Sequence, residues 1–423
     1  MWRAPRSAKY VQGIGFAHYP TNETSQGAVP PMSRNLSQTS RYAVILILLG
    51  LIALMEVRHP FPFFRLATFI LAFLALAGVA ALLRGKIRDG FVILASLAFG
   101  LSIIEAMATF LETKELIVVT NGLYAPQPVV DWGPEHAGRF HTQKTDPKSG
   151  VPIYTADYTI DSNLLRETSS AETGPTIVFF GDSFTFGVGL KNADTLPQVF
   201  ADLLGRKIRA LNLGFPGYGP QQFLAELHTG RFDSVIGAQP QLFIYMTMGA
   251  HLERTACKPF WMRRGPRYAL ENGQVVLKGD CYEGLSLWVL EWLEYMASYR
   301  LFIEPNLQKL THEDIELYIK VLLAAVNLGK EKYGVATLIP YIREPRYIHY
   351  IMGAGFSDDE IIQRLRDGGA MVVDVSLAND ECTDELCIKG DGHPTPLANR
   401  LRASILKDYI ERHIPGILVA GLQ

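Results

Sequence analysis

The sequence predicts an α/β protein in which three membrane-spanning helices precede a three-layer, doubly wound parallel sheet of five strands. Long apolar runs occupy most of residues 41–111. Short apolar runs rich in β-branched residues alternate with helical segments from Pro175 onward. Polar sequence with many turn-forming residues separates these two regions. Alternation of strands and helices is typical of a parallel sheet that is covered on both faces.

The N-terminal 40 residues carry little hydrophobic periodicity and many Gly, Pro, Ser and Thr residues. Such a composition cannot bury enough apolar surface to fold alone, so residues 1–40 are expected to form a disordered cytoplasmic leader. Met32 stands shortly before the first apolar run and is an alternative start to Met1. The sequence leaves this choice open.

Residues 41–111 are expected to form a three-helix transmembrane anchor. A helix needs about 20 apolar residues to cross a bilayer, within a range of about 17 to 25. The second and third runs have this length, and the first reaches it only if it extends to Val57. Core helices of a soluble domain are the alternative, which the short spacing of the runs disfavours. The three runs are 42–55, 66–83 and 91–111.

Basic residues set the expected orientation of this anchor. Positive charges collect before the first run and between the second and third runs, and such charges mark cytoplasmic loops. The domain after Leu111 should then lie outside, in the periplasm of a bacterium whose inner membrane holds the anchor. Arg58 and Arg65, between the first two runs, weaken the contrast. Glu105 is costly in lipid and is expected to face another helix or to lie near the outer boundary. A transporter is excluded, since the spans offer no other internal polar pathway.

All four cysteines follow the membrane region. An even number of cysteines in an external domain is compatible with two disulfides. The short spacings favour Cys257 with Cys281 and Cys382 with Cys387, although other pairings and four buried thiols stay open. A zinc site is disfavoured because no CxxC or His pair accompanies these cysteines, and no organic cofactor motif is visible. A net charge of −2 gives no basis for nucleic-acid binding.

The external region divides into an expected linker with a small β extension, residues 112–174, and a catalytic domain, residues 175–423. The alternating segment 151–163 suggests one or two strands of the extension. The domain's expected strands are 176–181, 208–214, 242–249, 336–342 and 371–377, and its expected helices are 195–205, 220–229, 311–331, 358–367 and 395–413.

An insertion, about 250–310, separates the third and fourth of these strands. It is expected to contain a hairpin that turns at Asn272-Gly273. The apolar helix that follows, 285–303, is expected to cover the site or to lie against the membrane. A fourth membrane span is the alternative, but it would put the C-terminal histidine motif in the cytoplasm.

Three segments that follow expected strands carry candidate chemistry. GDSFTFGVG places Ser183 at a strand-to-helix turn, where backbone N–H groups can stabilise an oxyanion. NLGFPGYGPQQF forces a tight turn at Gly217, whose N–H is a second candidate donor. DGHP places Asp391 two residues before His393, which can serve as general base while Asp391 holds the imidazole. Ordinary helix capping and turn formation explain each segment singly, but their combination favours a catalytic triad.

In this order the three segments resemble the SGNH/GDSL hydrolase superfamily: GDSF its first block, NLGFPG its second and DGHP its last. The resemblance covers roughly residues 175–415. It implies a flavodoxin-like sheet and a serine enzyme that cleaves or transfers acyl groups. Ser183 would be the nucleophile and first oxyanion donor, Gly217 the second donor, and Asp391 and His393 the rest of the triad. The D-x-H spacing resembles members that act on bacterial polysaccharides.

One block departs from the family pattern, in which an Asn after the third strand donates to the oxyanion. Here that strand is followed by GAHLER, without an Asn. Either backbone donors act alone, or His251 or Arg254 replaces the amide. The two side chains are otherwise expected to bind an anionic sugar or a carboxylate of the substrate, or to form structural ion pairs with Glu253 or Asp391. Three more side chains are weaker candidates for lining the site: Tyr218, Gln221 and Arg263.

These features predict an extracytoplasmic esterase or O-acyltransferase that acts on acylated cell-surface glycans through an acyl-serine intermediate. Transfer would need an acyl donor, which a membrane acyltransferase partner is expected to supply. A lipid esterase or thioesterase is one alternative. The other is a catalytically degenerate domain that binds glycan or scaffolds polysaccharide assembly, which the missing Asn favours.

Overall fold

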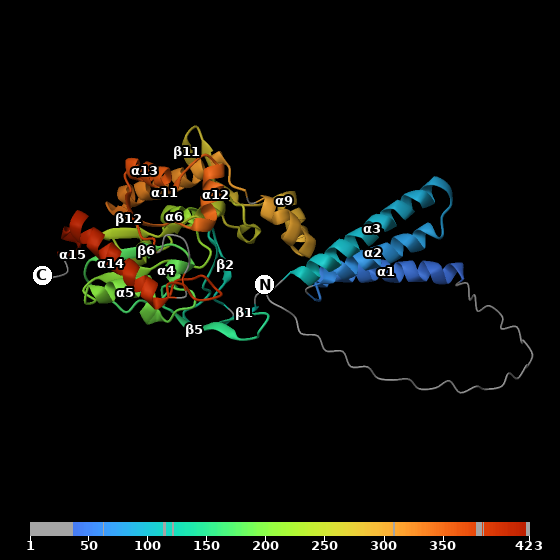
Figure 1. The fold of residues 1–423 in the computed structure, drawn as a ribbon, viewed down its shortest axis with the longest axis horizontal. Helices are drawn as coiled ribbons and strands as arrows, with labels where there is room; N and C mark the ends of the chain where they lie inside the picture. The colour runs from blue at the N-terminus through green and yellow to red at the C-terminus, as the bar shows by residue number, and fades with distance from the viewer. Residues whose placement is uncertain are drawn as a thin grey trace, which may run out of the picture.

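The computed structural model describes residues 37–61, 63–112, 116–120, 122–307, 309–377, 383 and 385–419. Three helices stand beside a larger α/β body, and the helix α9 lies between the two (Figure 1). The expected leader falls outside the described residues except for residues 37–40, of which 38–40 already belong to the first helix.

The three expected apolar helices form and lie side by side (Figure 1). They are α1 (Gln38–Arg58), α2 (Phe64–Ala80) and α3 (Gly85–Leu111). By length and composition α1 and α3 could cross a membrane, whereas α2 has only 17 residues. Large apolar side chains remain exposed on all three helices, among them Leu46, Ile70 and Ile93. Water is therefore a poor solvent for this part of the chain.

The main sheet has the strand order β13-β12-β8-β6-β7, and every neighbouring pair is parallel. Each of its strands lies within one of the five runs expected from the sequence. Nearly every residue of the central strands is buried, which explains why these runs are continuously apolar. A short strand, β9 (Thr247–Met248), continues β8 and pairs with β12. The strands of the order are β6 (Thr176–Phe180), β7 (Arg209–Asn212), β8 (Leu242–Tyr245), β12 (Ala336–Ile342) and β13 (Met371–Asp374).

Helices cover both faces of this sheet (Figure 1). On one face α14 packs beside α5, and on the other α11 packs beside α6 and α13. The long helix α11 begins with a capping box, in which the side chains of Thr311 and Asp314 each accept a hydrogen bond from the other's backbone N–H. The helices are α5 (Leu196–Leu203), α6 (Pro220–Thr229), α11 (His312–Tyr333), α12 (Pro345–Gly353), α13 (Asp358–Asp367) and α14 (Pro396–His413). Of these, α12 was not expected from the sequence.

The β extension is larger than the sequence suggested. Its antiparallel sheet has the order β1-β4-β5, and β2 and β3 form a separate ribbon. Arg166 bridges Ile160 of β5 to Asn212 of β7 and so joins the extension to the main sheet. A shared apolar cluster, which includes Phe140 and Phe186, packs the extension against the loops that follow β6 and β7. The strands are β1 (Leu116–Val119), β2 (Ala125–Gln127), β3 (Asp131–Gly133), β4 (Gly138–Thr145) and β5 (Pro152–Ile160).

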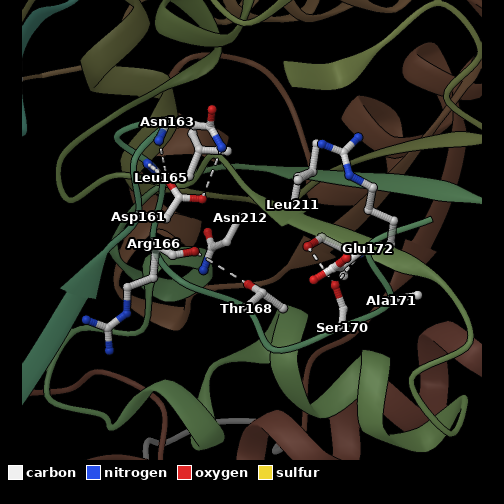
Figure 2. A pocket seen from close by; sticks show the side chains of 12 residues that line it. Asp161, Asn163, Leu165, Arg166, Thr168, Ser170, Ala171, Glu172, Leu211 and Asn212 are labelled. Atoms are coloured by element: carbon white, nitrogen blue, oxygen red, sulfur yellow. Dashed lines mark hydrogen bonds between the residues drawn. The ribbon is translucent and has the colours of Figure 1, made fainter. Parts of the chain in front are cut away.

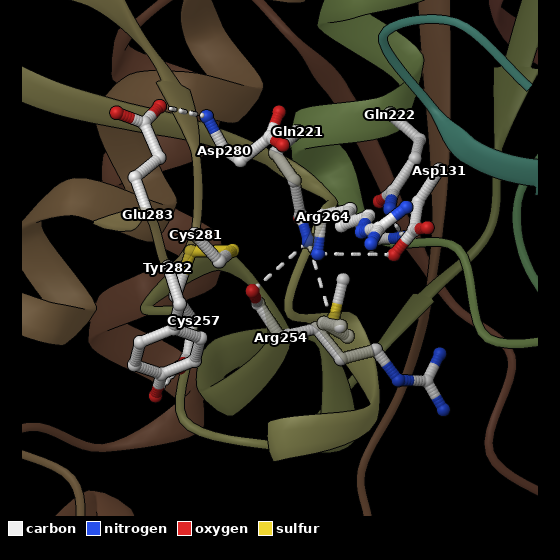
Figure 3. Close-up of a disulfide and its surroundings, with 12 residues drawn as sticks. Asp131, Gln221, Gln222, Arg254, Cys257, Arg264, Asp280, Cys281, Tyr282 and Glu283 are labelled. Carbon is white, nitrogen blue, oxygen red and sulfur yellow. Dashed lines mark hydrogen bonds between the residues drawn. A yellow bond between two sulfur atoms is a disulfide. The ribbon is translucent and has the colours of Figure 1, made fainter. Parts of the chain in front are cut away.

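The insertion contains the expected hairpin, β10 (Pro266–Glu271) and β11 (Gln274–Asp280). Asn272 and Gly273 have φ values of 51° and 80°, as a two-residue turn of the I′ type requires. The expected disulfide between Cys257 and Cys281 is present (Figure 3). Cys387 is also disulfide-bonded, and Cys382, its expected partner, lies outside the described residues. Elements before the hairpin are α8 (Ala250–Thr255) and the short turn η2 (Phe260–Met262).

The apolar segment after the hairpin does not form one long helix. It divides into α9 (Gly284–Glu294), the π-helical turn η3 (Tyr299–Ile303) and α10 (Glu304–Leu307). At 11 residues α9 is too short to span a bilayer. The alternative of a fourth span is therefore not the structure that this segment adopts.

This segment docks on the three apolar helices instead. Glu105 of α3 is 1% exposed, and its carboxylate accepts hydrogen bonds from Ala297 N at 2.6 Å and from Ser298 N at 3.1 Å and Oγ at 2.6 Å. Arg65 of α2 is paired with Glu56 of α1 and lies over the Trp292 ring of α9 at 4.6 Å. Glu105 and Arg65, two charged residues of the apolar helices, thus attach the insertion to these helices.

Candidate active site

Ser183 lies immediately after β6, at the start of the single-turn helix α4 (Ser183–Phe186). The chain reverses sharply here: Gly181 has a φ of 147°, and a Cβ at this position would collide with the Thr185 hydroxyl. Asp182 caps the turn, because its Oδ1 accepts the Phe184 N–H at 2.9 Å. This arrangement places a serine at the carboxyl end of a central strand, where ligands bind in open parallel sheets.

Gly217 lies in the loop after β7, which packs beside the nucleophile turn. Phe215 N donates to Gly181 O at 3.0 Å, and the Asn212 side chain donates to Thr185 O at 3.0 Å. Gly217 has a φ of 87°, which glycine adopts readily. Among the described residues, no atom accepts a hydrogen bond from the N–H of Ser183 or Gly217. Both groups are therefore free to donate to a ligand.

His393 and Asp391 lie in the loop between β13 and α14. His393 Nδ1 is 2.5 Å from Asp391 Oδ2, and His393 O accepts the Ile388 N–H at 2.7 Å. The imidazole is 23% exposed, whereas the Asp391 side chain is 2% exposed. The carboxylate thus orients one ring nitrogen and leaves the other for chemistry.

A lysine that the sequence did not single out completes this group. Lys144 of β4 donates from Nζ to Asp391 Oδ1 at 2.8 Å, and its side chain is only 7% exposed. Burial alone would raise the pKa of Asp391. The hydrogen bond and charge of His393, together with those of Lys144, outweigh burial and lower the pKa of Asp391 to about 2. Asp391 is therefore ionised at any physiological pH.

Ser183 and His393 line one hollow of about 580 Å³ at the carboxyl ends of the strands. This volume is within the usual range for ligand pockets. Asp391 and Arg254 line the same hollow, whereas Gly217 and His251 are not part of its lining. No hydrogen bond joins the Ser183 hydroxyl to His393 among the described residues. The other lining residues are Asp182, Phe184, Met248, Ile342, Arg343, Glu344, Pro345, Arg346, Ser376, Leu377, Leu386, Cys387, Gly392 and Arg402.

His251 and Arg254 both approach Asp182, not Glu253 or Asp391. His251 is fully buried behind the nucleophile turn, with Nε2 3.2 Å from Asp182 Oδ2. Its Nδ1 lies 3.0 Å from the Tyr245 hydroxyl. Burial would raise the pKa of Asp182, but its hydrogen bonds and the charges of both partners lower that pKa well below its usual range. His251 therefore supports the nucleophile turn from behind and is not placed to contact substrate.

Arg254 connects the two loops that frame the site. Its Nη1 donates to Asp182 Oδ2 at 2.8 Å and to Tyr218 O at 2.9 Å. The backbone N–H of Ala250, which follows the third strand, is not available as an oxyanion donor. It already donates to Glu344 Oε2 at 2.9 Å. Of the side chains considered as replacements for the missing Asn, only Arg254 reaches the hollow.

The three weaker candidates do not line this hollow. Tyr218 is buried, and its hydroxyl donates to Trp132 O at 2.6 Å. The Gln221 side chain is buried and donates to Arg254 O at 2.9 Å (Figure 3). Arg263 pairs with Glu294 of α9. These side chains support the loops around the site and do not face Ser183.

A second hollow, of about 290 Å³, lies away from Ser183 at the junction of the extension and β7 (Figure 2). It contains none of the candidate catalytic residues. Its buried Arg166 donates to Leu190 O and lies over the Tyr158 ring, which indicates a packing role. Within the described residues, no three His, Cys, Asp or Glu side chains are grouped so that they could hold a metal ion.

Comparison with known proteins finds no matching family model and no matching curated sequence. The solved structures that match include a lipolytic protein of the G-D-S-L family from Veillonella parvula, with 12% identity over 56% of this chain and 98% of that chain and a TM-score of 0.31. Another is a carbohydrate acetylesterase family member from Sinorhizobium meliloti, with 13% identity, 58% and 99% coverage and a TM-score of 0.32. A third is a family 3 carbohydrate esterase from Clostridium thermocellum, with 14% identity, 59% and 98% coverage and a TM-score of 0.29.

Proposed function

We propose that this chain is a serine esterase of the SGNH type, with a flavodoxin-like catalytic domain at residues 175–423. The observation that carries the proposal is the convergence of Ser183, His393 and Asp391 on one hollow, with His393 hydrogen-bonded to a buried, ionised Asp391. If Ser183 only capped a helix and His393 were only a surface residue, nothing would require both to line one pocket at the carboxyl ends of the strands.

The chemistry follows from this geometry. His393 takes the proton of the Ser183 hydroxyl as the oxygen attacks the ester carbonyl, and the N–H groups of Ser183 and Gly217 donate to the developing oxyanion. His393 then gives the proton to the leaving alkoxide, which leaves an acyl-serine. Water regenerates the enzyme in hydrolysis, and another hydroxyl does so in transfer. Contacts between serine and base are often long before substrate binds.

In this proposal Arg254 has a supporting role and does not replace the missing amide as an oxyanion donor. It joins Asp182 to the carbonyl of Tyr218 and so holds the nucleophile turn beside the loop that follows β7 and carries Gly217, here called the oxyanion loop. Loss of one oxyanion donor typically costs about 10²–10³-fold in rate. We therefore expect a slower enzyme than one with the Asn.

The location that we propose is a bacterial inner membrane, with α1, α2 and α3 as three spans (residues 41–111) and the remaining domains in the periplasm. The exposed apolar surface of these helices and the disulfides of the outer domain support this location. The contact of Glu105 with Ala297 and Ser298 also favours it, because a costly intramembrane carboxylate is thereby satisfied near one end of α3.

A substrate near the membrane follows from this location, and we propose an acylated cell-surface glycan. If the reaction is transfer, a membrane acyltransferase would supply the acyl group. In either reaction, residues 112–174 act as a linker whose strands support the catalytic loops.

The test uses the full chain in detergent with p-nitrophenyl acetate and a fluorophosphonate probe. Ser183→Ala and His393→Ala should each lower turnover by at least about 10³-fold, and Ser183→Ala should abolish labelling. Ser404→Ala, on the exposed face of α14, is the matched control and should behave as wild type. A folded wild type with neither turnover nor labelling would reject the esterase and favour a non-catalytic binding domain.

A further inference from the structure

Another hollow lies beside the oxyanion loop, and Ser183 is not among its lining residues. Its volume is about 760 Å³. The β2–β3 ribbon of the extension forms one wall, and the insertion forms the other. The lining residues are Pro126, Gln127, Pro128, Val129, Asp131, Trp132, Trp261, Arg263, Arg264 and Asp280.

Two tryptophans connect this hollow to the candidate active site. Their rings lie 5.6 Å apart in an edge-to-face arrangement. A Cβ added to Gly217 would lie 2.8 Å from the Trp132 ring and 3.0 Å from the Trp261 ring, so both rings touch the oxyanion loop. Trp261 also lies under the Arg254 guanidinium at 5.8 Å. This hollow is therefore adjacent to the Gly217 loop and to Arg254, which lines the hollow that contains Ser183.

The two tryptophan rings differ in their hydrogen bonding and in their exposure. Trp132 is held in place, since its Nε1 donates to Pro216 O at 2.9 Å. Trp261 is 47% exposed, which is unusual for the largest apolar side chain in a turn that is otherwise buried. The Cys257–Cys281 disulfide closes the loop that carries Trp261, so the ring is presented from a constrained backbone. An exposed aromatic ring on a rigid turn is suited to stacking against a ligand.

The polar groups around the two tryptophan rings can form hydrogen bonds with the hydroxyl groups of a ligand. Asp131 and Asp280 offer carboxylates, and the exposed Arg264 offers donors; Arg264 N also donates to Asp131 Oδ2 at 3.2 Å (Figure 3). Val129 and Asp131 have φ values of 69° and 78°. A β-branched residue rarely adopts this conformation, and such strain is common at ligand sites.

We propose that this hollow is a glycan subsite, in which a pyranose ring with equatorial hydroxyls stacks its C–H face on Trp261 while the carboxylates and Arg264 bind its hydroxyls. Such a sugar combines an apolar face with a polar rim, and so does the hollow. A free fatty acyl chain has no hydroxyl groups with which Asp131, Asp280 and the Arg264 side chain could form hydrogen bonds. The β2 strand lies on the side of the α/β body that faces α9 and the three helices (Figure 1). The glycan would therefore approach along the membrane surface.

This inference rests on the proposed function but is tested separately from it. Full-length Ser183→Ala protein in detergent, which cannot turn substrate over, is titrated calorimetrically with tetrasaccharides of β-1,4-linked glucose, xylose and N-acetylglucosamine. We expect saturable binding of at least one, weakened roughly tenfold or more by Trp261→Ala and retained by Trp261→Phe. Trp288→Ala is the matched control, because Trp288 is 64% exposed on α9, outside the hollow.

Binding that survives Trp261→Ala, or no saturable binding of any of the three sugars, would overturn the subsite. Trp261-dependent binding of phospholipid vesicles without sugar binding would overturn it as well and would assign the surface to lipid. Esterase activity of the wild type on p-nitrophenyl acetate reports the proposed function alone. Activity without sugar binding therefore rejects only the subsite, and sugar binding without activity rejects only the esterase.

Discussion

Lys144 offers the sharpest test of how the β extension contributes to the candidate triad. Its ammonium group is buried against Asp391, so Lys144→Met removes a positive charge and leaves the carboxylate with His393 as its remaining cationic partner. The negative charge of Asp391 then acts on the imidazole without compensation. Protonation of the imidazole should become easier, and the base should be lost at a higher pH.

The size of this effect follows from the geometry. Lys144 Nζ lies 2.8 Å from Asp391 Oδ1, and His393 Nδ1 lies 2.5 Å from Asp391 Oδ2. Together with the separation of the two carboxylate oxygens, these distances put Lys144 Nζ at most about 7.5 Å from His393 Nδ1. At an effective dielectric constant of about 20, two charges at this distance interact with about 2 kcal/mol. This corresponds to an upward shift of about 1.5 pH units in the midpoint of the acid limb of kcat/KM.

The assay is the pH dependence of kcat/KM for p-nitrophenyl acetate between pH 4 and 9. Lys144→Arg keeps the charge and should restore the wild-type profile, and Lys148→Met removes an exposed charge from the same hairpin as a control. An acid limb that stays at the same pH in folded Lys144→Met would refute the electrostatic coupling of Lys144 to the triad.

Acid stability provides a second readout of the same pair. The pKa of Asp391 is lowered to about 2 in the folded protein, against about 3.9 for an unfolded chain. Its ionised form therefore stabilises the fold above pH of about 4, and this contribution, about 2 to 3 kcal/mol, is lost as the pH falls toward 2. Without Lys144 the loss should begin at a higher pH, which thermal unfolding across this range would detect.

Three other changes have clear expected outcomes. Gly181→Ala would force an alanine into a φ of 147° and against Thr185, which should destabilise the nucleophile turn by about 1–3 kcal/mol; an unchanged melting temperature would contradict this. Glu105→Ala leaves two buried backbone N–H groups without their acceptor, which should cost about 1–3 kcal/mol each. Limited proteolysis should then cut near residues 297–298, and resistance equal to that of wild type would argue against this docking. Replacing Cys257 and Cys281 by Ser opens a loop with a sequence separation of 24 and should cost about 3 kcal/mol; denaturant unfolding that shows no loss would indicate that packing alone holds the insertion.

The main strands and the site motifs were predictable because their signals are local. A strand buried on both faces must be apolar at every position, so 176–181 and 242–249 are recognisable without knowledge of their neighbours. The GDSF, NLGFPG and DGHP segments carry backbone and side-chain requirements within a few residues. Parallel strands bring their carboxyl ends to one edge, and this rule sufficed to expect Ser183, Asp391 and His393 in one place.

The parts that were missed depend on contacts between distant segments. Lys144 and Asp391 are 247 residues apart, and nothing in an alternating strand marks one lysine as buried. The sequence left His251 open as an oxyanion donor, a substrate ligand or a member of an ion pair with Glu253 or Asp391, and the structure instead places its side chain behind the nucleophile turn, against Asp182. The tryptophan-lined hollow needs both the extension and the insertion, so neither segment alone could indicate it.

The sequence by itself determined the alternation of elements, the apolar character of the three helices and the identity of the candidate nucleophile and base, because local patterns and short motifs encode these properties. Only the tertiary structure decided which charges are buried together, how Glu105 is satisfied and what surrounds the oxyanion loop. Burial and hydrogen bonding between segments hundreds of residues apart depend on packing of the whole chain, which no local pattern carries.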